Sequence, residues 1–504
     1  MKATHDKPPS AARIIILANA AVLLLATAYF ILSPPFITRR MLSDPGLRTG
    51  AIPQFVGSMH RKLSPRFERW ARDRVASGVA GRLNLYDVPS TEWPMFSSVY
   101  YLWTTEALQT AWQRDKSGPE PAVYARGAVE AARALIMDPV HHTWVRTHWG
   151  DNYMHEQNVF FRTLVLAGLI STERILHDGR YMEVIRDQVE TLAAALDASP
   201  HGVLEDYPAE CYPIDVLAAV WVIKQGGLLT GIDTSAFVTR ALRAFDGEML
   251  DSKGLPPYLV DAKSGAQFDT SRGVGNSYVL IYAADLWPEV ADVWYRRYEE
   301  HFWQDSGWAL GFREYPRDRP DSEWTYDVDA GPILAGFSPA ANAFGVAAAR
   351  VNGRMDQAYA LSCQVIASCW PLPSGEWLGA RILSNPRHAP YLGQTALLYF
   401  FSREPHSDSV VIAVEKHPPL VLIQHLFFLG LATVVLASVA RLIRRWFGPK
   451  PPTQTPLLRL QLVLWAACIV TGGVLMIVGT TGWGAIALLC GQFFPRPKAQ
   501  SATC

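Results

Sequence analysis

Carboxylic acids and aromatic residues gather in the segment 202–215, which also contains two prolines. Its polar members are Glu205, Asp206, Tyr207, Glu210, Cys211, Tyr212 and Asp215. The prolines exclude a helix through the first half, so this segment is expected to be a shaped loop that opens the next helix. Apolar surroundings raise the pKa of a carboxyl group and make it a proton donor at neutral pH. The segment therefore predicts acid/base chemistry, with a solvated acidic loop and a helix-capping Asp215 as the alternative.

A second acidic segment, 323–339, alternates carboxylates with apolar residues. In an extended chain Asp327 and Asp329 would face the same way and orient a substrate hydroxyl or a water molecule. Trp324, beside them, is a candidate substrate contact. A metal-binding Asp-x-Asp of a nucleotide-sugar transferase would require alternating strands and helices, which the surrounding sequence lacks. The alternative to this substrate-orienting role is a structural one, in which these residues form a turn and cap the helix that follows.

Two further groups are candidate substrate contacts rather than metal ligands or nucleophiles. Glu156 and Asn158 are in the first turn of a predicted helix, but the His-Glu-x-x-His spacing of a zinc site is absent, so no metal is expected. Cys211 would need a neighbouring base to act as a nucleophile, and the sequence places none beside it. It is therefore grouped with Tyr207 and Tyr212 as a substrate contact.

The elements that position these residues are predicted to be helices almost throughout 61–404. Apolar residues recur with a period of 3.6 in 64–77, 99–114, 121–137, 156–177, 180–198, 212–226, 234–250, 275–286, 288–303, 335–351, 354–369 and 388–402. Strand patterns are sparse. Helical hairpins closed into an (α/α)6 barrel are the predicted fold of this all-α domain. An open α-solenoid is the alternative, but it usually shows a sequence repeat, and this chain shows none.

The composition of the 504-residue chain indicates that part of it lies in a membrane, because only 18% of its residues are charged. The formal net charge is zero, which argues against a nucleic-acid partner. Transmembrane helices are predicted at 14–33, 419–440 and 457–478. A shorter apolar run in 479–504, followed by a tail, is either a fourth span or a re-entrant segment. The first helix is interpreted as an uncleaved anchor, because no small-residue cleavage site precedes Pro34.

Basic residues predict the orientation of these helices. The loop 441–456 carries several arginines and a lysine without any acid, so it is expected in the cytoplasm, like the tail 1–13. The helical domain 61–404 then lies outside the cytoplasm, between linkers at 34–60 and 405–418. The lipid bilayer is a predicted partner, and the sequence does not indicate an oligomeric state.

Over about residues 145–355 the chain resembles the linalool dehydratase/isomerase family. The landmarks, in order, are Glu156–Asn158 opening a long helix, an Ala-Ser-Pro end near Pro200, Gly202 with its acidic loop, Leu255–Gly265 with Tyr258, and Asp327–Gly331 before a small-residue helix. The resemblance implies an (α/α)6-barrel catalytic domain and elimination, hydration or isomerisation chemistry. Tyr258, in the Leu255–Gly265 landmark, is a further candidate substrate contact.

This chain departs from the family at the active site. The family's two cysteine positions fall near Glu205 and near Ile214–Asp215, and its histidine position falls near Leu164. The resemblance therefore supports the fold, while the chemistry here would depend on carboxylates instead of thiols.

Three functions follow from these observations. The first is a membrane-anchored lyase or isomerase acting on a hydroxylated small molecule, without a cofactor, with catalytic residues Glu205, Asp206, Asp215, Asp327 and Asp329. The second is a glycoside hydrolase or related carbohydrate enzyme of the cell envelope, because (α/α)6 barrels host many of these. The third is a non-catalytic envelope binding protein, whose carboxyl groups would have ordinary pKa values.

Overall fold

The chain divides into two units in the computed structural model, which describes residues 11–319, 323–406 and 416–447 and isolated positions between 460 and 471. One unit combines Met1–Arg39 with Leu422–Cys504, and the other is Arg40–Val421. Most of the described residues are helical, which confirms an all-α protein. The larger unit starts earlier and ends later than the domain 61–404 expected from the sequence.

Two of the predicted membrane helices are present as long apolar helices. The first runs through α1 (Ala11–Thr27), the π-helical η1 (Ala28–Leu32) and α2 (Ser33–Leu42), and the second is α20 (Pro419–Phe447). The segments Arg13–Leu42 and Pro419–Arg444 are long and apolar enough to cross a membrane. The first therefore extends beyond the predicted 14–33, because the wider π-helical turn precedes Pro34 and lets the helix continue past it.

The predicted linker 34–60 is largely helical. It contains α2, the short α3 (Gly46–Thr49) and the start of α4 (Gln54–Ser77). Pro45 and Pro53 occupy the positions just before α3 and α4, where a missing N–H breaks no helical hydrogen bond. The shorter apolar run in 479–504, most of the predicted span 457–478 and most of the linker 405–418 lie outside the described residues.

Helices and short hairpins make up the rest of the larger unit. Its remaining elements are η2 (Val79–Arg82), α5 (Val88–Thr91), α6 (Trp93–Asp115), α7 (Pro121–Tyr124), α8 (Arg126–Ile136), α9 (Thr143–Trp149), α10 (Val159–Leu176), α11 (Met182–Ala198), α12 (Pro213–Thr230), α13 (Ser235–Ala241), η3 (Leu242–Phe245), η4 (Gly247–Met249), β1 (Leu259–Val260), β2 (Gln267–Asp269), α14 (Gly273–Leu286), α15 (Pro288–Phe302), β3 (Trp303–Asp305), β4 (Leu310–Phe312), β5 (Trp324–Asp327), β6 (Gly331–Leu334), α16 (Pro339–Val351), α17 (Met355–Ser368), α18 (Leu378–Leu383) and α19 (Leu392–Ser402).

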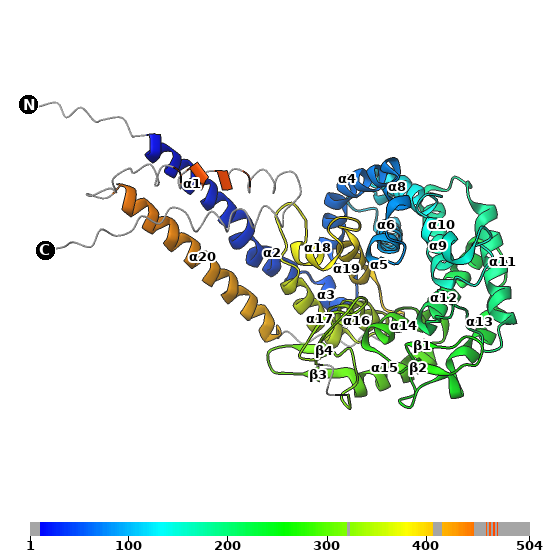
Figure 1. Ribbon diagram of the computed structural model, residues 1–504. Coiled ribbons are helices and arrows are strands. Elements are labelled where there is room, and N and C mark those ends of the chain that lie inside the picture. Colours follow the sequence, from blue (N-terminus) through cyan, green and yellow to red (C-terminus); the bar gives the residue numbers. More distant parts are fainter. Residues whose placement is uncertain are drawn as a thin grey trace, which may run out of the picture. The chain divides into compact units, whose positions relative to one another are not determined.

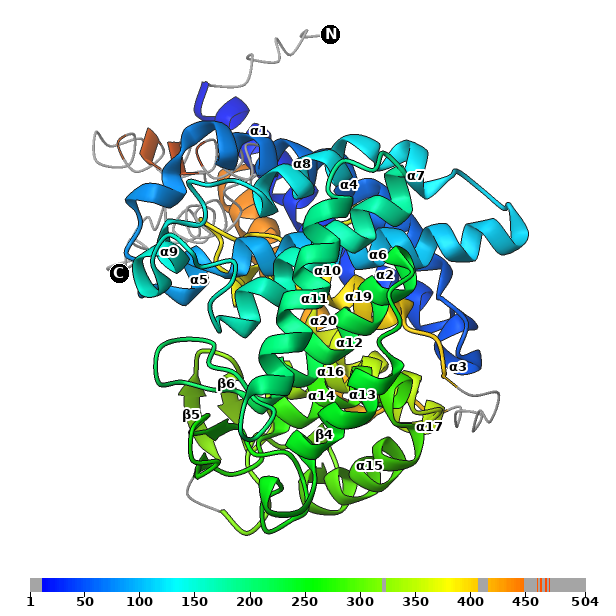
Figure 2. The ribbon, with the colours of Figure 1, turned by 90° about the vertical axis from the view of Figure 1, so that its right-hand side faces the viewer.

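A set of buried helices in the larger unit forms a closed series of neighbours. In order they are α6, α10, α12, α14, α16 and α19; each packs on the next, and α19 packs on α6. Other helices cover this series from outside, as α11 covers α10 and α12 in both views (Figures 1 and 2). The pairs α14–α15, α16–α17 and α18–α19 continue the alternation of inner and outer helices.

Burial separates the inner helices from the outer ones. Most residues of α12 and nearly all of α14 are buried, whereas α11 and α15 bury one face. A helix that is apolar all round must be covered on all sides, and an amphipathic helix covers it. The segment Pro213–Thr230 has the length and hydropathy of a membrane span, but it is this inner helix α12 and is mostly buried within its unit.

Three two-stranded antiparallel hairpins, which the sparse strand patterns did not predict, complete the larger unit. They pair β1 with β2, β3 with β4, and β5 with β6. In the last, Trp324 pairs with Leu334 and Asp327 with Gly331, which leaves 328–330 as the turn. Gly331 has φ +78°, a left-handed conformation that a glycine adopts without strain.

Candidate functional site

A cavity of about 1040 Å³ lies within the larger unit, at the end where the inner helices begin. Residues from the first turns of α6, α10, α12, α14, α16 and α19 line it, together with the loop before α12 and the β5–β6 hairpin. Its volume is at the upper end of the range of small-molecule sites. Its acidic and tyrosine lining residues are Glu92, Tyr100, Asp206, Tyr207, Glu210, Tyr212, Asp215, Tyr258, Tyr278, Tyr326 and Asp329.

Asp215 lies in the first turn of α12, directly after Pro213 at the helix start. Its carboxyl group borders the cavity and accepts no hydrogen bond from any described residue. Burial, reinforced by the charge of Asp329, raises its pKa to about 8. A carboxyl group with that pKa is largely protonated at neutral pH and can donate a proton to a bound substrate.

Glu92, which the sequence analysis did not select, is the second cavity carboxyl without a partner. It precedes α6, its side chain is 7% exposed, and Oε1 has no hydrogen-bond partner among the described residues. Burial, and then the charges of Asp329, Asp215 and Glu210, raises its pKa well above the ordinary value. The sequence feature that could have indicated Glu92 is a single acid directly before the apolar start of a helix, Trp93–Trp103.

Asp206 holds the acidic loop in place. Its Oδ1 accepts the backbone N–H of Phe160 at 3.0 Å, and its Oδ2 accepts that of Tyr212 at 2.8 Å. Burial and the charge of Asp215 raise its pKa well above the ordinary value, although both hydrogen bonds act in the opposite direction. Because both oxygens are occupied, Asp206 positions the start of α10 and the loop before α12.

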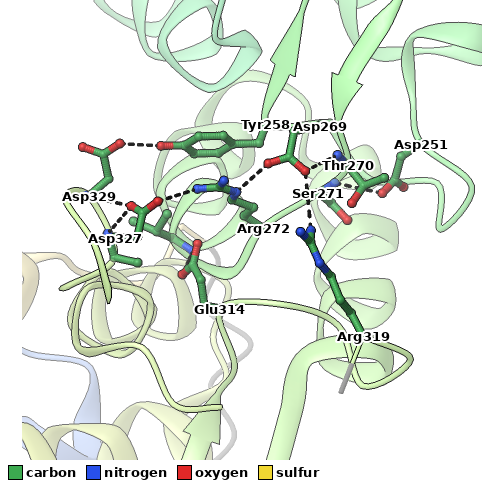
Figure 3. Close-up of polar contacts among 12 residues, drawn as sticks. Asp251, Tyr258, Asp269, Thr270, Ser271, Arg272, Glu314, Arg319, Asp327 and Asp329 are labelled. Carbon is green, nitrogen blue, oxygen red and sulfur yellow. Dashed lines mark hydrogen bonds and ion pairs between the residues drawn. The ribbon is translucent and has the colours of Figure 1, made fainter. Parts of the chain in front are cut away.

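Asp329 and Tyr258 form a hydrogen-bonded pair at the cavity (Figure 3). The Tyr258 hydroxyl donates to Asp329 Oδ2 over 2.6 Å. Asp329 lines the cavity and is exposed. The surrounding protein nevertheless desolvates its carboxyl group and raises its pKa. The hydrogen bond from Tyr258 opposes this shift, and the charge of Asp327 adds to it.

The structure does not bring Asp327 to the cavity. Asp327 ends β5, and its Oδ1 accepts the backbone N–H groups of Asp329 and Ala330, which closes the hairpin turn. Its Oδ2 accepts Arg272 Nη1 at 3.0 Å (Figure 3). The two aspartates therefore point to different partners, contrary to the expectation that they face the same way, because a tight turn replaces the extended chain after Asp327.

Arg272 connects the two hairpins that border this region. Its Nε donates to Asp269 at 2.7 Å, its Nη1 donates to Asp327, and its guanidinium carbon lies 4.2 Å from the centre of the Tyr258 ring (Figure 3). A planar guanidinium can bond two carboxylates and stack on an aromatic ring at the same time. Arg272 thus holds β1–β2 and β5–β6 together, with Tyr258 between them.

Replacing this arginine should loosen the β5–β6 hairpin. In Arg272→Met we expect faster hydrogen exchange at the amides of 324–334, because Asp327 loses its cationic partner, and unchanged exchange in α12 and α14. Hydrogen-exchange mass spectrometry on the full chain measures both. Arg126→Met, which removes an exposed pair with Glu130 on α8, is the matched control. Equal exchange in the two variants would contradict the role given to Arg272.

Several other predicted site residues lie outside the cavity. Glu205 Oε2 accepts the backbone N–H of Ala209 at 3.0 Å, so its side chain stabilises its own loop. The backbone carbonyl of Glu156 accepts a hydrogen bond from Arg162 Nη1. Asn158 is the residue before α10 and has a left-handed φ of +36°. The predicted helix start at Glu156 is thus a turn, and α10 begins at Val159.

Cys211 and Trp324 also lie away from the cavity lining. Cys211 is fully buried and pairs through its backbone with Val260, and burial raises the pKa of its thiol, which disfavours a thiolate. Trp324 is 71% exposed on β5. Of the predicted substrate contacts, the structure brings Tyr207, Tyr212 and Tyr258 to the cavity. In the described ranges no group of His, Cys, Asp or Glu side chains is arranged to hold a metal ion.

The raised pKa of Asp215 predicts an unusual dependence of stability on pH. The folded protein binds this proton with a pKa of about 8, against an ordinary value of 3.8. Between these values the folded state holds more protons than the unfolded state, so this group's contribution to stability falls as the pH rises. We expect Asp215→Asn to unfold at a higher temperature than the wild type at pH 8, with a smaller difference at pH 4.

Thermal unfolding of the full chain in detergent, followed by intrinsic fluorescence, measures this difference. Glu205→Gln, an acid-to-amide change outside the cavity, serves as the control and should show no such trend. A wild type that is as stable as Asp215→Asn at pH 8 would mean that Asp215 ionises normally.

In comparisons with known proteins, no family model and no curated protein matches the chain.

Proposed function

We propose that this protein is a membrane-attached enzyme that uses paired carboxyl groups for acid/base chemistry on a hydroxylated substrate. The observation that supports this most directly is the pair Glu92 and Asp215. Both border one cavity, neither has a side-chain partner in the described part of the chain, and both have raised pKa values. Perturbed carboxyl groups in a cleft are typical of catalytic sites, whereas a simple binding protein needs no such groups.

For the fold we propose the (α/α)6 barrel and kinship with the linalool dehydratase/isomerase family. The closed series of inner helices and the outer helices that cover it support the barrel. The cavity at the helix starts is where such a barrel would place its site. The acidic segment 202–215, named in the resemblance, contributes Asp206 from the loop and Asp215 from the first turn of α12 to this cavity.

The proposed reaction is elimination of water and its reverse. The pair of protonated carboxyl groups, Asp215 and Glu92, acts as one unit that donates a proton to the hydroxyl oxygen; the C–O bond breaks and water leaves. An ionised carboxylate, for which Asp329 held by Tyr258 is the candidate, takes a proton from the neighbouring carbon as the double bond forms. One carboxyl group loses a proton and another gains one, so the site as a whole is unchanged in charge. Hydration is the same path in reverse.

Glycoside hydrolysis is the second candidate, because aromatic rings and several carboxyl groups share the cavity. Sugars stack on aromatic rings, and most glycoside hydrolases use a pair of carboxyl groups. The wall formed by α17, α18 and α19 is largely apolar, with Leu361, Val365, Leu392 and Leu397. Such a wall suits a hydrocarbon better than a sugar, so elimination and hydration is the preferred proposal.

We further propose that the larger unit lies outside the cytoplasm. The basic, acid-free run that follows the apolar part of α20 supports a cytoplasmic end for that helix. The chain would then act on a substrate of the cell envelope.

Oxygen exchange tests the reaction class without a known product. The full chain is incubated in H₂¹⁸O with panels of alcohols and of oligosaccharides, and mass spectrometry follows the label. Reversible dehydration puts ¹⁸O into the alcohol, whereas hydrolysis puts it into a released sugar. Label in the sugars alone would replace the preferred proposal by the second, and label in neither panel would reject both for the compounds tested.

A further inference from the structure

Large apolar side chains are exposed around the mouth of the cavity. They are Trp308, Tyr326, Val328, Leu334, Ile382 and Leu383, here called the rim patch, and each also lines the cavity. Tyr326 is 70% exposed and Ile382 61%. They come from the β3–β4 connection, the β5–β6 hairpin and α18, and α18 is more than forty residues beyond the two hairpins. Exposed apolar residues gathered in this way indicate an interaction surface.

The β5–β6 hairpin separates its apolar and charged side chains. Residues alternate between the two faces of a strand, so Trp324 and Tyr326 share one face and Asp327 lies on the other. Asp327 is held by Arg272, and Glu323 lies 3.5 Å from Arg313. Asp327 and Glu323 are therefore paired with arginines and Asp329 with the Tyr258 hydroxyl, and the face that carries Trp324 and Tyr326 is apolar.

We propose that the rim patch docks onto a lipid bilayer and opens the cavity to the lipid phase. Tryptophan and tyrosine beside leucine and isoleucine are the side chains that favour the membrane–water interface. Leu420, the second residue of α20, belongs to the larger unit and lines the same cavity. The lining thus continues to the start of a helix that is apolar enough to cross a membrane. The docking does not depend on the proposed function. The entry of a substrate from the lipid rests on it.

Depth-dependent quenching tests this docking on the full chain in phosphatidylcholine nanodiscs. Cys468, Cys490 and Cys504 are replaced by serine, and Ile382→Cys or Leu334→Cys is labelled with an environment-sensitive fluorophore. The control is Leu228→Cys, which is 70% exposed and lies thirteen residues beyond Asp215 on α12, about 20 Å along the helix.

We expect labels at Ile382 and Leu334 to show blue-shifted emission and loss of intensity when the lipids carry a nitroxide on the upper acyl chain. The label at Leu228 should show neither. A rim label that behaves like the control overturns the proposal. A blue shift without nitroxide quenching also overturns it, because another protein surface would then cover the patch. Neither readout uses catalysis, so this test and the ¹⁸O test fail independently.

Discussion

Glu92→Gln is expected to lower kcat by about 10²–10⁴-fold, the usual contribution of a general acid or base. Glutamine preserves the shape of the side chain but can neither release nor accept a proton. Glu92 borders the cavity, and Oε1 has no partner among the described residues, so the substitution should leave the surrounding packing intact. The measurement is the rate of ¹⁸O exchange for the best substrate of the wild type.

The control for this loss is Glu205→Gln, the same chemical change on an acid that lies outside the cavity. It should keep kcat close to that of the wild type. The double variant Glu92→Gln/Asp215→Asn should be scarcely slower than either single variant, because groups that act in one step are not additive. Unchanged kcat in Glu92→Gln, with an unchanged melting temperature, would remove this residue from the mechanism.

The second large effect is expected in stability, from Arg350→Met. Arg350 on α16 is fully buried, and its guanidinium donates to the backbone carbonyl oxygens of Gly46, Gly50, Ala51 and Arg403 at 2.7–3.3 Å. Methionine fills similar space but leaves these carbonyl groups without their donor. An unsatisfied buried carbonyl costs about 1–3 kcal/mol, so a loss of about 3 kcal/mol or more is expected.

Thermal unfolding of the full chain in detergent measures this loss as a drop of several degrees in melting temperature. Burial lowers the pKa of Arg350 to about 10, so the loss should be constant across neutral pH. Arg354→Met is the matched control, because its pair with Glu299 is partly exposed and contributes about 1 kcal/mol or less. Equal melting temperatures for the two variants would show that Arg350 does not hold the segment 46–51 to α16.

The helices were largely predictable from the sequence. Each of the twelve expected helical segments contains helix in the structure, because the apolar period of an amphipathic helix depends on residues three or four apart. The ends were less predictable: α4 begins at Gln54 rather than 64, and the segment 34–60 is helical. This segment was predicted to be a linker, but its Pro45 and Pro53 stand just before helices, where proline is tolerated.

The candidate site was predictable in part. Asp206 and Asp215 stand in one proline-containing loop, so their proximity follows from the chain itself. Asp329 reaches the cavity and Asp327 does not, although they are two residues apart, because the hairpin turn and Arg272 decide where each points. Glu205 and Asp206 are likewise neighbours with different roles. Side-chain direction in a loop depends on partners that are distant in the sequence.

The sequence by itself determined that this chain is mostly helical, that it carries long apolar segments at both ends, and that carboxyl groups gather before α12. Only the tertiary structure brought Glu92, Asp215 and the Asp329–Tyr258 pair to one cavity. Their separation in the sequence leaves no local pattern, and the packing of α10 against both α6 and α12 brings the starts of the helices that carry Glu92 and Asp215 together. The raised pKa values have the same origin, since desolvation exists only once the helices have closed around the carboxyl groups.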